Sequence, residues 1–443
     1  MTVDHLSAGR LWGTVTEILP GLVELSGVSH AVGIGDSVSI EKSGPPLIGE
    51  VMSVSETGVR VLMFSSTEAV RIGDRAFVAS QDQIEIGDHW LGALVDYRGQ
   101  VQMRRTPPVP NARCARIPLQ RDPVPAAARK PLGPRLSTGL NVTDTLLPVC
   151  RGQRIGLFAG SGIGKSTLIG QLAGGMRADR IVIALIGERG REVQEFIDEI
   201  LPKEILPKTT VVAATASEPP GAKKRAALCA IAAAEHYRDQ GHSVLFLFDS
   251  LTRFAEAHRE TALMAGETPA LNAFPPSTVR VVSELAERTG PGHRQQGDIT
   301  AIFSVLVAGS DFEEPVADMV RGILDGHIVL SRKIAERGRY PAIDVLRSVS
   351  RSLPKAATPE QNHLLQTYRN LITTYDEIAP MVRAGLFEFG KDPQADIAYS
   401  LFPSLDKYLT EQSDGIDTAF EYLKGLMLPA LDAAASTQAL EQA

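Results

Sequence analysis

A glycine-rich stretch with one lysine is the part of this sequence best suited to chemistry. Residues 159–166 read AGSGIGKS, between an apolar run, RIGLF, and a helix-forming segment, STLIGQLAG. Strand, loop and helix in this order predict backbone N–H groups that converge on a phosphate at the positive end of a helix dipole. Gly160, Gly162 and Gly164 let the loop bend around the anion. Alanine stands at 159 where the strict motif has glycine, and we expect it to be tolerated there.

Two side chains at the end of this loop could act on a nucleoside triphosphate. We expect Lys165 to reach the β- and γ-phosphate oxygens and the Ser166 hydroxyl to ligate Mg²⁺.

Two acids outside the loop could complete the site. Asp249 ends the apolar run SVLFLFD and fits the magnesium side, although an acid that only caps the next helix is the alternative. Hydrolysis also needs a group that activates water. Glu188 follows the apolar run IALIG, but a surface ion-pair cluster with its neighbouring arginines explains it equally well.

Alternating strands and helices must hold these groups together. Near-continuous apolar runs are typical of parallel strands covered on both faces, and five occur here: RIGLFAG, RIVIALIG, TTVVAAT, SVLFLFD and ITAIFSVL. The segment 222–238 between two of them is strongly helix-forming. We therefore predict an α/β fold with a doubly wound parallel sheet, whose carboxyl edge faces the ligand.

Different patterns flank this core. Six short runs between residues 10 and 80, rich in Val, Ile and Phe and separated by turn residues, predict a small β-barrel or sandwich. Apolar residues from Leu364 to Tyr375 recur with a helical period. The expected domains are an N-terminal β-barrel at 1–82, a P-loop core at 83–355, of which 83–135 is partly linker, and a helical domain at 356–443.

Composition limits the functions open to the chain. With 443 residues, 44% of them hydrophobic, and a net charge of -7, it can bury sizeable cores and has no global basic field for nucleic acid. Its three cysteines show no metal-ligand spacing and fit a reducing compartment. We see no secretory signal and no run of about 18 apolar residues, so we expect a cytoplasmic protein.

One basic stretch stands out against this acidic background. Residues 104–135 contain eight prolines and eight Arg or Lys residues, with Asp122 as the only acid. A contact for nucleic acid or lipid is one interpretation, but the stretch lacks the aromatic residues on which single strands stack. We favour a proline-stiffened connector that lies over a domain surface.

Longer motifs indicate a known family. The chain resembles the hexameric ATPases of type III export systems, most closely the flagellar one, in RGQRIGLFAGSGIGKSTL, ALIGERGREV, FDSLTRFAEAHRE, FPPSTVRVVSELAERTG and the long EEPVADMVRGILDGHIVLSRKIAERGRYPAIDVLRSVSR. These enzymes are relatives of the catalytic subunits of rotary ATP synthases. The resemblance is dense from about residue 90 to 355 and weaker at both ends. It implies a RecA-like P-loop core that hydrolyses ATP, with Mg²⁺, to energise protein export.

The resemblance also assigns the residues that handle phosphate. It implies that Asp249 is the acid on the magnesium side, that Glu188 activates water, and that Arg189 lies near the γ-phosphate. The loop residues expected to bind the nucleotide, with Ser166 also on the metal, are Gly160, Ser161, Gly162, Ile163, Gly164, Lys165, Ser166 and Thr167.

Three more residues are assigned by the resemblance alone. Tyr340 matches an aromatic that stacks on adenine, although the sequence by itself favours an ordinary half-buried core tyrosine. Phe387 falls near a second such aromatic. Arg351, in SVSR, matches an arginine finger that reaches the neighbouring subunit's site. Because one chain then provides both faces of every interface, a homohexameric ring is expected.

The family also implies partners and competing functions. Expected partners are further copies of the chain, the regulator, stalk and gate proteins of an export apparatus, and export substrates with their chaperones. No nucleic acid is expected, and the protein would lie peripherally at the cytoplasmic face of the inner membrane. One alternative is a catalytic subunit of a proton-coupled rotary ATP synthase, which would not need a finger at Arg351. Another is a hexameric RNA-translocating ATPase, which the acidic net charge disfavours.

Overall fold

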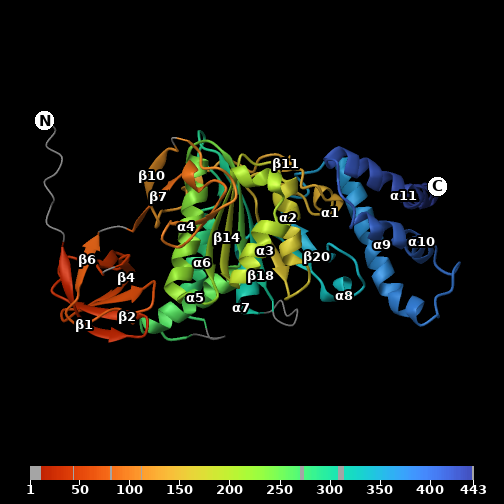
Figure 1. Cartoon of the computed structure of the whole chain (residues 1–443). Helices are drawn as coiled ribbons and strands as arrows, with labels where there is room; N and C mark the ends of the chain where they lie inside the picture. The colour runs from red at the N-terminus through yellow and green to blue at the C-terminus, as the bar shows by residue number, and fades with distance from the viewer. Residues whose placement is uncertain are drawn as a thin grey trace.

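Three regions follow one another along the chain in the computed structural model, which describes residues 11–42, 44–79, 82–110, 112–269, 274–307 and 314–441. A β-barrel lies at one end, a central sheet with helices on both faces follows, and C-terminal helices lie at the end remote from the barrel (Figure 1). This architecture confirms the predicted fold class.

The domain limits near residues 82 and 355 stay predictions, and the start of the chain, on which the targeting prediction depends, lies outside the described residues. Among the described helices, none is long and apolar enough to cross a membrane.

The barrel closes from six antiparallel strands in the order β1-β2-β5-β4-β3-β6. Alternation of apolar and polar residues gives each strand one face toward the barrel interior. In β3, Val38 and Ile40 are fully buried while the alternating serines are half exposed. Closure leaves this small sheet without an unpaired edge. The strands are β1 Trp12–Leu19, β2 Leu22–Ser26, β3 Ser37–Ile40, β4 Leu47–Val54, β5 Val59–Met63 and β6 Arg75–Ala79.

A ten-stranded sheet forms the core, in the order β20-β19-β13-β18-β16-β14-β15-β8-β9 with β17 paired to β18. All neighbours from β19 to β8 are parallel, and β9 and β20 add one antiparallel strand at each edge. The five strands predicted from apolar runs are confirmed: β13 Arg154–Ala159, β14 Arg180–Glu188, β15 Thr209–Thr215, β16 Ser243–Asp249 and β18 Asp298–Leu306. The others are β8 Ala93–Val95, β9 Val101–Arg104, β17 Gly290–Pro291, β19 Gly326–Leu330 and β20 Ile343–Ser350.

Helices bury both faces of this sheet, which explains why its strands are apolar throughout. In β14, Val182 and Ala184 belong to the core beneath α4 to α7, whereas Ile181 and Ile183 belong to the core beneath α2. The alanine-rich segment predicted as a helix is α4 Pro220–Asp239. The other core helices are α2 Lys165–Gly175, α3 Gly190–Glu195, α5 Leu251–Met264, α6 Ser277–Glu287, α7 Pro315–Ile323 and α8 Arg332–Ala335.

The basic stretch 104–135, here called the strap, runs over the core and directs many of its cations onto it. Arg105 forms a two-bond ion pair with Asp198 at 2.6 and 2.7 Å. Lys130 pairs with Asp298 at 2.7 Å, and the Arg129 guanidinium donates to backbone carbonyls of residues 287 and 289. Because these cations bind groups of the same chain, the structure agrees with the interpretation of the strap as a connector that lies over a domain surface.

The C-terminal helices pack on the same face as α2. Helix α9 Pro359–Arg383 begins with a capping box, in which Thr358 and Gln361 each satisfy a backbone N–H of the other. Its apolar stripe buries Leu364, Leu365 and Tyr368, as the period predicts. Helices α10 Pro393–Tyr408 and α11 Ile416–Glu441 complete the group.

Candidate functional site

The glycine loop joins β13 to α2 at the carboxyl edge of the parallel strands. Gly162 and Gly164 have φ angles of 75° and 86°, which L side chains rarely adopt, so these two positions need glycine. Helix α2 begins after Gly164 without a side-chain cap, which leaves its first N–H groups available to an anion. Arg332 of α8 donates a hydrogen bond of 3.1 Å to the Ser161 carbonyl and steadies the loop from outside.

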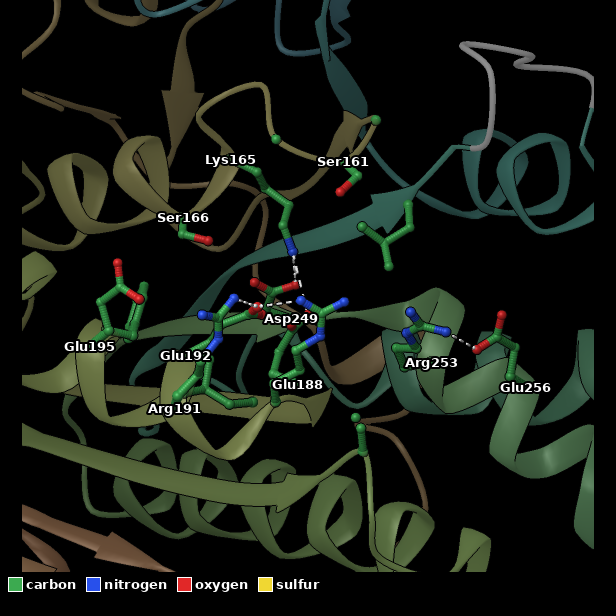
Figure 2. A pocket seen from close by; sticks show the side chains of 18 of the residues that line it. Ser161, Lys165, Ser166, Glu188, Arg191, Glu192, Glu195, Asp249, Arg253 and Glu256 are labelled. Atoms are coloured by element: carbon green, nitrogen blue, oxygen red, sulfur yellow. Dashed lines mark hydrogen bonds and ion pairs between the residues drawn. The ribbon is translucent and has the colours of Figure 1, made fainter.

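A cavity of about 910 Å³, here called the loop cavity, opens in front of this loop between α3 and α5 (Figure 2). The structure brings most of the expected loop residues to its wall, including Lys165, Ser166 and Thr167. Ile163 differs, because its side chain is buried in the core beneath the loop. Only its backbone could contact a ligand.

An ion-pair network occupies the centre of the loop cavity. The Lys165 ammonium bonds the Asp249 carboxylate and lies 3.8 Å from Glu188 Oε1. Ser304 of β18 donates a further hydrogen bond of 2.6 Å to Asp249 Oδ1. The two acids end the adjacent strands β14 and β16, as the sequence predicts, and Figure 2 shows both directed toward the lysine. Phosphate oxygens entering here would compete with these carboxylates for Lys165.

Glu188 has the protonation properties of a general base. Burial, and then the negative charge of Asp249, raise its pKa to about 7, while Lys165 opposes the shift. A carboxylate with a pKa near the working pH can accept a proton and release it again. Strongly shifted groups of this kind cluster at functional sites, so the catalytic role of Glu188 stays a prediction that its burial and its charged neighbours support.

Arginines line both walls of the loop cavity, and sequence reasoning named only some of them. Arg189 and Arg191 on the α3 side are 71% and 77% exposed and lie against Glu192. Arg253 on α5 was missed. Its side chain packs over Gly187, and a hydrogen bond with Glu256 and the nearby Glu188 raise its pKa. Its position, one helical turn after Asp249, was the signal that could have revealed it.

The two expected adenine-stacking aromatics lie in different places. The Tyr340 ring, 52% exposed, lies beside the loop, where a Cβ added to Gly164 would be 3.3 Å from Tyr340 Cδ1. Phe387 lies between α9 and α10 and stacks on Tyr399, with ring centroids 4.9 Å apart. It does not line the loop cavity.

Arg351 lies at the opposite end of the sheet from the glycine loop of its own chain. Its backbone N–H donates to the Asp325 carbonyl at 3.0 Å, and Asp325 in turn accepts from the backbone of Arg154, the first residue of β13. The loop follows the other end of this six-residue strand, which spans about 20 Å. The exposed Arg351 side chain, whose guanidinium donates to the Arg321 carbonyl at 3.1 Å, therefore lies outside its own loop cavity.

The residues present fit a magnesium-bound triphosphate. A Cβ at Gly162 would meet nothing within 4 Å, so the loop has room for phosphate against its backbone. Ser166 and Asp249 both line the loop cavity and offer a hydroxyl and a carboxylate, which are oxygen ligands that Mg²⁺ prefers. Within the described ranges, no cluster of three or more His, Cys, Asp or Glu could hold a metal by itself.

Comparison with known proteins agrees with this geometry. The nucleotide-binding domain of the ATP synthase alpha/beta family matches residues 139–350. The flagellum-specific ATP synthase of Caulobacter vibrioides is 38% identical over 95% of this chain and 97% of its own, and that of Bacillus subtilis is 36% identical over 93% of each. The chain belongs to the flagellum-specific ATP synthase family.

Solved structures extend the family's likeness to the whole fold. The assembled ATPase EscN of the enteropathogenic E. coli type III secretion system aligns with a TM-score of 0.83 and 35% identity, covering 94% of this chain and 99% of that chain. EscN in complex with its central stalk EscO aligns with a TM-score of 0.82 at the same identity and coverage. The T3SS EscN ATPase C-terminal domain matches residues 357–427, which confirms the likeness beyond the sheet.

Proposed function

We propose that this protein hydrolyses Mg-ATP to energise protein export through a flagellar or related type III secretion apparatus. The convergence of Lys165, Asp249 and Glu188 in front of the glycine loop, in a chain of this family, carries the proposal. A direct test is phosphate release from ATP by the purified chain with and without Mg²⁺, and absence of Mg²⁺-dependent release would contradict it.

The side chains divide the chemistry between them. The loop N–H groups and Lys165 hold the phosphates, and the Ser166 hydroxyl and the Asp249 carboxylate would hold Mg²⁺, which would supply positive charge to the phosphate oxygens. Glu188 accepts the proton of the attacking water. Arg189 and Arg253, on opposite walls, neutralise charge that develops on the γ-phosphate. Tyr340 stacks on the adenine beside the loop, and Phe387 would join it only after the α9–α10 turn moves.

Completion of the site requires a second copy. Arg351 faces away from its own loop cavity, so it acts as a finger in a neighbouring one, and a homohexameric ring closes such head-to-tail contacts. A finger of this kind is worth about 10³–10⁵ in rate. Arg351→Ala should bind nucleotide as a monomer but lose the rise in specific activity with protein concentration. Equal specific activity of dilute and concentrated wild-type enzyme would contradict the shared site.

Localisation and partners follow from the same function. The chain would work in the cytoplasm, at the inner face of the membrane, held there by regulator, stalk and gate proteins and meeting export substrates and chaperones. Among the alternatives, the RNA motor lacks support because many of the strap's cations contact the core. RNA should therefore leave the ATPase rate unchanged. A catalytic subunit of a rotary synthase would not need Arg351, so loss of activity in Arg351→Ala also argues against that role.

A further inference from the structure

The edge strand that precedes Arg351 presents an arginine that the hydrolysis scheme does not use. The register of β20 against β19 shifts between His327 and Val329, so that four residues of β20 stand opposite a single residue of β19. Arg347 lies in this bulge and is exposed. Bulges on edge strands re-aim side chains away from the sheet. Arg347 is thus presented outward, four residues before the proposed finger.

A complementary charge lies on one wall of the loop cavity. Helix α5 turns Arg253, Glu256, Ala257 and Glu260 to the cavity, which is the spacing of a single helix face. Arg253 and Glu256 pair at 2.8 Å. Glu260 is exposed and has no ion-pair partner among the residues that the structure describes. This wall therefore keeps one uncompensated negative charge at the mouth.

The opposite wall suits an incoming arginine less well. Glu195 of α3 also lacks an ion-pair partner within the described part of the chain, and Figure 2 shows it across the cavity from Glu256. However, Arg189 and Arg191 stand on the same side, both more than two-thirds exposed. A further arginine would meet two like charges there, a juxtaposition that interfaces avoid.

The distances along the two elements agree. In the proposed ring, Arg351 of one copy reaches the neighbour's γ-phosphate, beside Arg253. From Arg253 to Glu260, two turns of helix span about 10 Å. The four residues from Arg351 back to Arg347 span at most about 14 Å. A copy that inserts its finger therefore carries Arg347 within reach of Glu260.

We propose that Arg347 of one copy pairs with Glu260 of the next and fixes the register in which the finger enters. The inference rests on the proposed function, since it takes the position of Arg351 from it. The partner is a second copy of this chain in a head-to-tail contact. The competing explanation is that Arg347 only blunts an exposed sheet edge. A charged side chain that only protects the sheet edge could be a glutamate as well as an arginine. Reversing the charge therefore distinguishes edge protection from pairing with Glu260.

The experiment measures ring assembly of the full chain by mass photometry across protein concentration, with ATP and Mg²⁺. Arg347→Glu and Glu260→Arg should each raise the concentration for half-assembly at least about tenfold, since close interfacial charge pairs couple strongly. The double variant Arg347→Glu/Glu260→Arg should return to within about threefold of wild type. Glu195→Arg is the matched control, and combining it with Arg347→Glu should restore nothing. Thermal unfolding of each variant verifies that it is folded.

The outcomes separate this pairing from the function beneath it. A double variant no better than Arg347→Glu would overturn the pairing, as would rescue by Glu195→Arg in its place. An unaltered half-assembly concentration in Arg347→Glu would assign Arg347 to edge protection. If wild-type chain hydrolyses ATP in a concentration-dependent way while the double variant fails, only the pairing is lost. If wild type shows no Mg²⁺-dependent hydrolysis, the proposed function is lost with it.

Discussion

The loop cavity and a second cavity, here called the joint cavity, are nearly equal in volume, about 910 and 870 Å³, yet differ in what they can do. The joint cavity lies between the barrel, the strap and helices α4 to α6. Each cavity contains a lysine and a glutamate: Lys165 with Glu188, and Lys224 with Glu50. In both glutamates, burial is the main cause of a raised pKa.

The surroundings of the two pairs make the difference. Lys165 contacts two carboxylates beside a bent glycine loop and a helix N-terminus. The Lys224 ammonium has no hydrogen bond or ion pair among the described residues, and burial lowers its pKa. Gln120 donates to Glu50 at 3.3 Å, and the described residues that line the joint cavity include no glycine-rich loop. We therefore expect phosphate chemistry only in the loop cavity, where helix N–H groups converge and Asp249 provides a second acid.

Replacing each lysine by methionine should show the largest contrast. Lys165→Met removes a cation directed at the phosphates, and we expect kcat/KM to fall by about 10⁵-fold, the upper end of such effects. Lys224→Met keeps the volume of the side chain and removes an ammonium group whose charged form burial already disfavours. We therefore expect kcat/KM to stay within about twofold of wild type. Steady-state phosphate release measures both. Similar losses in the two variants would mean that the joint cavity takes part in hydrolysis.

Neutralising each glutamate should give a smaller contrast. Glu188→Gln removes the proposed general base, and kcat should fall by about 10²–10⁴-fold, while Mg-ATP should still bind. Glu50→Gln is the matched control and should leave kcat within about twofold. Single-turnover kinetics with pre-bound nucleotide isolates the chemical step. Undiminished turnover of Glu188→Gln would remove Glu188 from the mechanism.

The pH dependence should report the raised pKa of Glu188. Since the base must be ionised, kcat/KM should rise about tenfold per unit below pH 7 and level off above it. The free energy of unfolding should change with pH in the opposite direction to activity. A carboxyl group whose pKa is about 7 in the folded protein and ordinarily 4.5 stabilises the fold fully below pH 4.5, and this stabilisation is lost as the pH rises through 7. Glu188→Gln should therefore gain melting temperature relative to wild type between pH 4.5 and 8. A constant difference across this range would contradict the raised pKa.

Much of the fold and the phosphate end of the site could be predicted from sequence, because the signals there are local. The apolar runs that end in Asp249 and Glu188 predicted two strands of the sheet and the acids at their ends. The spacing of the glycines predicted the bend of the loop. Arg253 was missed because its role depends on α5 passing the end of β14. The bulge at Arg347 was missed too, since it arises from the pairing of β20 with β19 and leaves no mark in the residue order.

In the proposed ring, the separation of the glycine loop and Arg351 by the length of β13 would make each subunit half of two different reaction centres. Two inactive chains could then repair one another. Rings mixed from Glu188→Gln and Arg351→Ala chains would place intact Glu188 opposite intact Arg351 at about one quarter of random interfaces. Activity should return on mixing before assembly and stay absent on mixing two preformed, non-exchanging rings, a genetic complementation reproduced within a single oligomer.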